Sequence, residues 1–230
     1  MSRKFVALLS LLFILGSCVA TGNYQRGLDA YNQNDYSTAL LEWKTLAEQG
    51  NRKAQFFLGQ MYFKGLGVSK NIKNAFKWFS LAAEQDDSVA LNNLGVMYDK
   101  GLGVLQDFKI ASNYFELSAE RGYALGQNNL GKLYYFGRGV PRDFKKAFKL
   151  FELAAKNEFA NAQYNLGVMY EKGHGVKRDL VQSYKWYDIA FSLGYRDALK
   201  RMVNVKRRLT HPQLVKAEQL SFGWLLNSLK

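Results

Sequence analysis

The chain has 230 residues, which is long enough for one or two globular domains or for one elongated array. Its hydrophobic content of 48% and its two prolines exclude a largely disordered or low-complexity protein. The single cysteine excludes a disulfide framework, so the fold must be stabilised by packing. The net charge of +13 is compatible with an acidic protein, a nucleic acid or an anionic envelope surface as partner.

Residues 1–17 predict a secretory signal peptide. Arg3 and Lys4 form a basic start, an apolar run extends from Phe5 to Leu15, and small residues follow. This run is short for a membrane span. A buried N-terminal helix is the alternative, but the order of the three parts favours export.

Cys18 closes the apolar run in the sequence Leu-Gly-Ser-Cys. This stretch resembles the lipobox of bacterial lipoproteins, in which the cysteine is lipidated and becomes the new N-terminus. The resemblance implies a lipid anchor at Cys18, a tether over residues 18–23, and a place in the outer membrane or periplasm. Cleavage after Ala20 is the alternative, and it would give a soluble periplasmic or secreted protein.

Residues 24–50 predict a first, shorter helix pair. Asp35, Ala39, Trp43 and Ala47 stand at positions that recur in the second half of each later unit. The glycine loop of the later units is absent from this first one.

Residues 51–194 contain four copies of a 36-residue unit. Each copy carries the motif Leu-Gly-x-x-Tyr-x-x-Gly-x-Gly-Val, and the four leucines are Leu58, Leu94, Leu130 and Leu166. A period that is kept through this many copies indicates a repeat array.

Each copy predicts two helices. In the first helix Ala54, Leu58 and Tyr62 recur every four residues and form one apolar stripe. The glycine that follows suits a helix C-cap, and an Asn or Asp then caps the second helix. These caps are Asn71, Asp107, Asp143 and Asp179. Phosphate binding by the glycine loop is the alternative, but the loop has neither a preceding strand pattern nor a fixed lysine after it.

The residues and their spacing resemble the Sel-one-like repeat family, a branch of the tetratricopeptide-repeat superfamily. The resemblance is carried by the Ala-x-x-x-Leu-Gly-x-x-Tyr helix, the glycine loop, the Asp, and the aromatic and alanine pairs, over residues 24–200. It implies an all-α fold, a right-handed superhelical solenoid of helix–turn–helix repeats. Residues 24–50 look like an ordinary tetratricopeptide helix pair. Residues 195–230 lose the period and are expected to form a C-terminal capping region with a helix.

No catalytic constellation is evident. His174 and His211 lie in unrelated contexts, and the chain has neither a metal-ligand spacing nor a nucleophile motif, so we expect no metal and no cofactor. The family includes cysteine-rich secreted members described as β-lactam-binding or β-lactam-hydrolysing proteins, which makes a cell-wall-related or β-lactam enzyme the alternative. This chain lacks their paired cysteines, and a non-catalytic role is therefore favoured.

The candidate binding surface is the concave wall that the first helices of a solenoid form. Asn93, Asn129 and Asn165 recur there, preceded by Asn92, Asn128 and Tyr164, with Lys132 on the same helix as Asn129. An asparagine offers a donor and an acceptor to a peptide backbone. Tetratricopeptide relatives imply that a partner protein or an extended peptide docks there, and the positive charge favours an acidic one. The alternative is that these asparagines bond neighbouring helices within the array.

The sequence thus predicts a protein–protein interaction scaffold of the bacterial cell envelope with a concave binding groove. Nucleic acid is not an expected partner, because the chain carries an export signal and no nucleic-acid-binding motif. A denser basic patch lies at Leu199–Arg208, and a solvated surface explains it equally well.

Overall fold

The computed structural model describes residues 22–228, so the expected signal peptide, Cys18 and most of the tether lie outside the described residues. Within residues 22–228 the chain forms twelve α-helices and no strand. The helices are α1 (Tyr24–Asn32), α2 (Tyr36–Glu48), α3 (Arg52–Lys64), α4 (Ile72–Ala83), α5 (Ser88–Lys100), α6 (Phe108–Glu120), α7 (Ala124–Phe136), α8 (Phe144–Lys156), α9 (Ala160–Lys172), α10 (Leu180–Ser192), α11 (Ala198–Lys206) and α12 (His211–Ser228).

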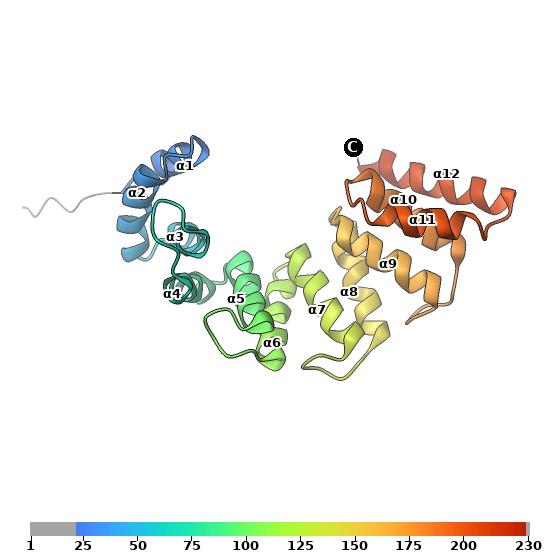
Figure 1. Cartoon of the computed structure of the whole chain (residues 1–230), viewed down its shortest axis with the longest axis horizontal. Helices are drawn as coiled ribbons and strands as arrows, with labels where there is room; N and C mark the ends of the chain where they lie inside the picture. The colour runs from blue at the N-terminus through green and yellow to red at the C-terminus, as the bar shows by residue number, and fades with distance from the viewer. Residues whose placement is uncertain (1–21, 229–230) are drawn as a thin grey trace, which may run out of the picture.

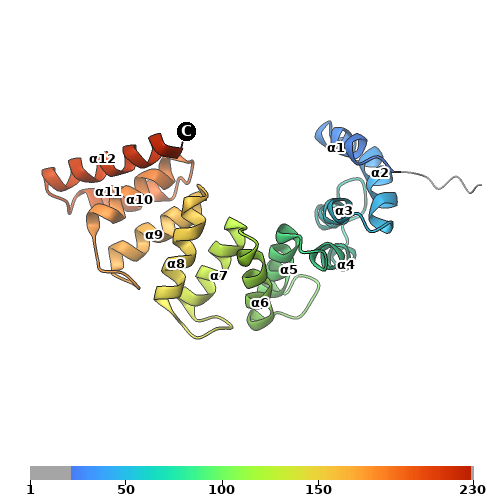
Figure 2. The same ribbon diagram turned by 180° about the vertical axis from the view of Figure 1, so that it is seen from behind.

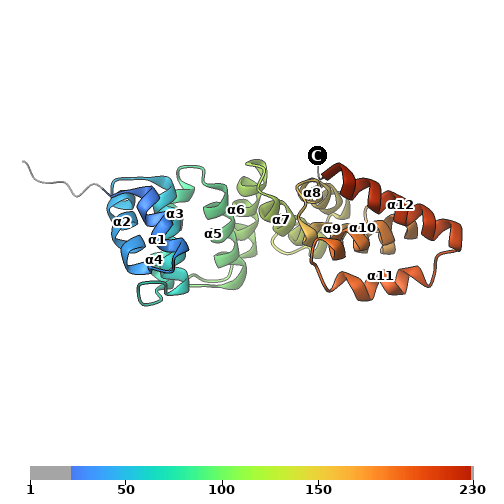
Figure 3. The same cartoon turned by 90° about the horizontal axis from the view of Figure 1, so that it is seen from above.

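The helices from α1 to α11 pack in tandem, each against its neighbours in the sequence, and α12 packs on α10. Figures 1 and 2 show an open arch with α1 at one end and α12 at the other, and Figure 3 shows the elongated array from above. In the middle of the arch α3 and α5 lie toward its open side, and α4 and α6 lie toward its outer side (Figure 1). The all-α repeat solenoid predicted from the sequence is therefore confirmed.

The apolar core is a series of clusters along the array rather than one centre. In one of them Phe79 of α4 packs with Leu94 and Met97 of α5, so the cluster spans two repeats. Each repeat buries its apolar face against the next one, and its stability depends on that neighbour.

The glycine of each Leu-Gly step lets an aromatic ring approach the helix closely. A Cβ atom built on Gly131 of α7 would lie 2.7 Å from Phe151 of α8, and one on Gly95 of α5 would lie 2.6 Å from Phe115 of α6. Both rings are almost fully buried. A glycine inside a helix costs roughly 0.5–1 kcal/mol. Burying each ring stabilises the fold by about 1.5–3 kcal/mol, which more than offsets that cost.

The glycine loop ends the first helix and docks on the preceding repeat. Gly137 caps α7 with a φ of 68°, the left-handed C-cap expected from the sequence. Gly139 has a φ of 71°, and a Cβ atom there would overlap the carbonyl group of Phe108 at the start of α6. Asp143 then caps α8 by accepting a hydrogen bond from the backbone N–H of Lys146. These glycines join repeats, which gives them a structural role.

Two repeats lack the glycine that elsewhere follows the second helix. Gly122 has a φ of 79° after α6, and Asp86 and Glu158 take the same left-handed conformation with φ values of 60° and 57°. This conformation is strained for a residue with a side chain. The geometry of the turn is thus imposed by the array and not by the residue that occupies it.

The array ends differently at its two termini. In the first pair Trp43 is fully buried, and its indole N–H donates a hydrogen bond to the Tyr24 carbonyl. At the other end α11 and α12 both pack on α10. Among the helices of residues 22–228, none is long and apolar enough to cross a membrane.

Candidate binding groove

A row of four pockets follows the first helices of the repeats, and we call this row the inner groove. The first pocket lies between α3 and α5, the second between α5 and α7, the third between α7 and α9, and the fourth between α9 and α11. Their volumes are about 170, 260, 260 and 480 Å³ in that order. Each contains at least one residue of the predicted site: Asn93 lines the first pocket, Asn129 and Lys132 the second, Lys132, Tyr164 and Asn165 the third, and Tyr164 the fourth.

Asparagines of successive first helices are joined by hydrogen bonds, and we call this series the asparagine ladder. Asn129 Nδ2 donates to Asn92 Oδ1 at 2.9 Å, and Asn165 Nδ2 donates to Asn128 Oδ1 at 2.9 Å. Asn92 and Asn128 are 1% and 3% exposed. These two residues therefore lie behind the surface of the groove, where they bond neighbouring helices as the structural alternative predicted.

The carbonyl groups of Asn129 and Asn165 remain accessible to a ligand. Both side chains are partly exposed, and within the described residues neither Oδ1 atom accepts a hydrogen bond. Asn93 cannot form the same bond, because the preceding repeat carries Phe56 of α3 where the later repeats carry Asn92 and Asn128. Its entire amide therefore lines the first pocket without a hydrogen-bond partner in residues 22–228.

Arg201 of α11 extends the ladder by one step. It stands 36 residues after Asn165, and its guanidinium interacts with the side chain of Tyr164, the residue before Asn165 on α9. Arg201 lines both the third and the fourth pocket. It was not among the residues expected in the groove, although its spacing from Asn165 could have identified it.

Basic side chains outnumber acidic ones in the first three pockets. The acidic lining residue of these pockets, within the described chain, is Asp99 alone. The basic lining residues are Lys64, Lys100, Lys132, Arg138, Lys172 and Arg201. The excess of positive charge on the whole chain is thus also present where the repeats form pockets.

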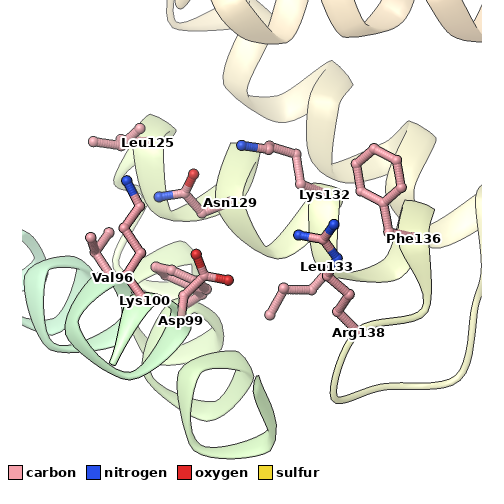
Figure 4. A pocket seen from close by; sticks show the side chains of 10 residues that line it. Val96, Asp99, Lys100, Leu125, Asn129, Lys132, Leu133, Phe136 and Arg138 are labelled. Carbon is pink, nitrogen blue, oxygen red and sulfur yellow. The ribbon is translucent and has the colours of Figure 1, made fainter. Parts of the chain in front are cut away.

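Phe136, the last residue of α7, lies where the second and third pockets meet. Its side chain is 56% exposed, and Lys132, one turn earlier on α7, also lines both pockets. Figure 4 shows both side chains on α7, with Asp99 and Lys100 of α5 on the other side of the second pocket. Other repeats carry a lysine at the position of Phe136, namely Lys64, Lys100 and Lys172.

The histidines lie in different parts of the array. His174, in the loop after α9, stacks on Phe144 with ring centroids 4.3 Å apart, and its Nδ1 atom is 3.0 Å from the Tyr135 hydroxyl. Desolvation lowers the pKa of His174, and the nearby charge of Lys172 lowers it further. His211 is exposed at the start of α12. In the described part of the chain, no group of three or more His, Cys, Asp or Glu side chains could hold a metal ion.

The periodic segments match a known repeat. Residues 52–87, 88–123, 124–159 and 160–195 each match the Sel1 repeat. The chain belongs to the Sel1 repeat family. Its four Sel1 repeats contain α3 to α10 and supply all the lining residues of the first three pockets except Arg201 of α11. Sel1 repeats generally mediate interactions between proteins.

Several solved structures resemble this Sel1 repeat array. A protective antigen present in uropathogenic Escherichia coli strains, displaying an SLR fold, is 35% identical over 80% of this chain, with a TM-score of 0.75. The match spans 40% of that antigen. A Sel1 repeat protein from Oxalobacter formigenes is 31% identical over 79% of this chain and 75% of its own, with a TM-score of 0.73. Among curated proteins, none matches this chain.

Proposed function

We propose that this Sel1 repeat protein is a non-catalytic scaffold of the bacterial cell envelope whose inner groove binds an extended segment of a partner protein. The observation that carries the proposal is the row of pockets along successive first helices, lined by lysines and by asparagine carbonyl groups that accept no hydrogen bond within residues 22–228. A row of this kind fits a ligand that extends along the array, because repeated units offer repeated contacts.

The ladder supports recognition of a peptide backbone. The Oδ1 atoms of Asn129 and Asn165 are placed to accept hydrogen bonds from backbone N–H groups, while their Nδ2 atoms hold the helices together. Asn93 offers both a donor and an acceptor. Contacts to a backbone carry no sequence preference, so side chains elsewhere in the groove must supply the specificity.

The charge of the groove supports an acidic partner segment. Lys100, Lys132 and Lys172 line it, and in residues 22–228 none of the three forms a salt bridge. Complementary charge increases the rate of encounter and disfavours partners of the same sign. A segment with several carboxylates is therefore the ligand that this surface fits best.

The placement of strongly shifted pKa values supports a non-catalytic role. Burial raises the pKa of Tyr184 to about 12 and also raises that of Tyr187, and both side chains lie on α10, outside the four pockets. Catalytic groups with perturbed pKa values are usually found in a cleft. Hydrolysis of a chromogenic β-lactam by the purified protein, above the rate in buffer, would overturn this part of the proposal.

Export and anchoring are proposed from the first residues of the sequence. A basic start, an apolar run and Cys18 in a lipobox-like stretch support a lipoprotein of the outer membrane or periplasm. Replacing Cys18 by serine should then release the protein from the membrane fraction. A mature protein that begins at Thr21 and carries no fatty acid would overturn the anchor.

Cross-linking from single positions tests the groove. A photo-activatable amino acid replaces either Lys132 in the groove or Leu41 on α2, which is 69% exposed and lines none of the four pockets. A partner bound in the groove is cross-linked from position 132 and not from position 41. Equal yields from both positions, or no product from position 132, would contradict the proposal.

A further inference from the structure

We infer that the groove around Phe136 recognises a short segment in which one aromatic or large aliphatic side chain is flanked by carboxylates. This inference rests on the proposed function, because it names the ligand chemistry of the same groove. It is carried by an exposed ring, an apolar pocket next to that ring, and unpaired cations around both.

The exposed ring is the first observation. Phe136 is 56% exposed at a position where the neighbouring repeats carry Lys100 and Lys172. Its side chain therefore contributes little to the core, and aromatic side chains are enriched at protein–protein interfaces relative to the rest of the surface. The guanidinium of Arg138 lies 5.2 Å from the centre of the ring, and the Tyr135 ring packs edge-on with its centre 5.0 Å away.

The third pocket supplies the apolar cavity. It has a volume of about 260 Å³ and lies against Phe136 between α7 and α9. Its apolar and aromatic lining residues are Tyr135, Phe136, Phe151, Tyr164 and Val168. Large rings of this kind dominate the energetics of interfaces because each removes much apolar area from water. An apolar side chain of the ligand that enters this pocket would be buried there and would cover the Phe136 ring.

The basic side chains around the third pocket indicate which groups of the ligand stand next to its apolar side chain. Lys132 and Lys172 line the third pocket, and neither forms a salt bridge within residues 22–228. Arg201 lines it too, but its charge is shared with Glu171 at 3.5 Å. Carboxylates on the two sides of the anchor would meet the two free ammonium groups.

Binding of defined probes to the purified protein tests the inference. The main probe is a fluorescent peptide of about twelve residues, with one tryptophan between two pairs of aspartates in a glycine–serine background. Two matched peptides carry alanine in place of the tryptophan, or asparagines in place of the aspartates. A labelled oligothymidine of similar length tests nucleic acid, since aromatic and basic side chains also bind single strands. We expect the main probe to bind at least tenfold more tightly than the other three.

Substitutions assign the binding to this part of the groove. Phe136→Lys introduces the residue that the neighbouring repeats carry at this position, and it should lower the affinity for the main probe at least tenfold. The helical circular dichroism spectrum and the melting temperature should stay unchanged. Lys132→Glu combined with Lys172→Glu should lower the affinity for the main probe further. The same double variant should bind more tightly a probe in which lysines replace the aspartates. The matched control is Leu41→Lys on α2, an apolar position outside the groove that is 69% exposed against 56% for Phe136, which should leave the affinity unchanged.

The outcomes separate this inference from the proposed function. If the alanine probe or the oligothymidine binds as tightly as the main probe, or if Phe136→Lys keeps the affinity, the inference is wrong. The proposed function then still stands if position 132 cross-links to a partner in the Phe136→Lys variant. If position 132 of the unaltered groove cross-links to nothing, the proposed function itself fails.

Discussion

The hydroxyl group of Tyr187 donates a 2.8 Å hydrogen bond to Glu171, which joins α10 to α9. Glu171 also lies 3.5 Å from Arg201 and 3.4 Å from Arg208, so one carboxylate connects the last Sel1 repeat to the residues that follow it. Tyr187 is fully buried, and burial together with its bond to Glu171 raises the pKa of its hydroxyl. The neutral hydroxyl therefore remains a donor well above the pH at which an ordinary tyrosine ionises.

Replacing Tyr187 by phenylalanine should lower the free energy of unfolding by about 1.5–3 kcal/mol, the range for one hydrogen bond to a charged group. Phenylalanine fits the site, because Phe79, Phe115 and Phe151 occupy the same position in the other repeats. Urea denaturation measures the change. A midpoint equal to that of the unaltered protein, at the same m-value, would show that the bond contributes nothing.

The helices and their caps were predictable from the sequence because they depend on residues close in the chain. Asp143 caps α8 through an amide three residues later, and Gly137 ends α7 through its own φ. The hydrogen bonds of the asparagine ladder could not be predicted in this way, because they join helices of different repeats. Asn128 and Asn129 are adjacent on α7 and project in directions about 100° apart, and a repeat length cannot tell which of them meets the neighbouring helix. That choice depends on how successive repeats are rotated.

Phe136 was also not predicted as a groove residue. The sequence places it at the end of a helix next to a glycine loop, where the ring could equally well pack on the loop. Its exposure follows from the space between α7 and α9, which is a property of the whole array. The same holds for Glu158, whose left-handed conformation follows from the turn geometry and not from its own preference.

Replacing Gly131 by alanine should lower the free energy of unfolding by about 1–3 kcal/mol, the usual cost of overpacking a core. The added methyl group would lie 2.7 Å from the Phe151 ring, which is 2% exposed, so the ring or the helix would have to shift. Gly223→Ala on α12 is the control. No atom lies within 4 Å of its new methyl group, so it should stabilise the helix by about 0.5–1 kcal/mol. Thermal unfolding compares them, and equal melting temperatures for the two variants would contradict the packing argument.

The stability of the loop after α9 should depend on pH through His174. Desolvation, with Lys172 and Arg142, lowers its pKa in the folded state below the ordinary value of 6.5. As the pH falls, the unfolded chain therefore binds the proton before the folded protein does. The contribution of His174 to stability is fully present above pH 6.5 and is lost as the pH falls from 6.5 to the pKa of the folded state. His174→Leu, which introduces the residue of Leu66 and Leu102 at this position, should remove that part of the pH dependence.

The measurement for His174 is an NMR titration of its ring, compared with urea denaturation at several pH values. We expect a titration midpoint below 6.5 and a difference in stability between the two proteins that changes between neutral and mildly acidic pH. A midpoint above 6.5 would contradict the environment that Phe144 and Tyr135 provide.

A double-mutant cycle on the ladder separates its structural role from its binding role. Asn165→Ala removes the donor to Asn128, whose side chain is 3% exposed, and a buried acceptor without a partner costs about 1–3 kcal/mol. Combining Asn165→Ala with Asn128→Ala removes both partners, and the coupling between them should be about 0.5–3 kcal/mol.

Asn93→Ala is the matched control for that cycle, because it stands in the same position of its repeat and its amide has no partner in residues 22–228. Its free energy of unfolding should stay within about 0.5 kcal/mol of the original value. If Asn93 binds the backbone of the partner segment, the same variant should bind that segment several-fold more weakly. Stability and affinity then change at different asparagines of one column: stability at Asn165, which bonds its neighbour, and affinity at Asn93, which does not. Equal losses of stability at both positions would mean that the inner surface uses all of these amides for packing, and the groove would have to recognise its ligand through Lys132 and Phe136 alone.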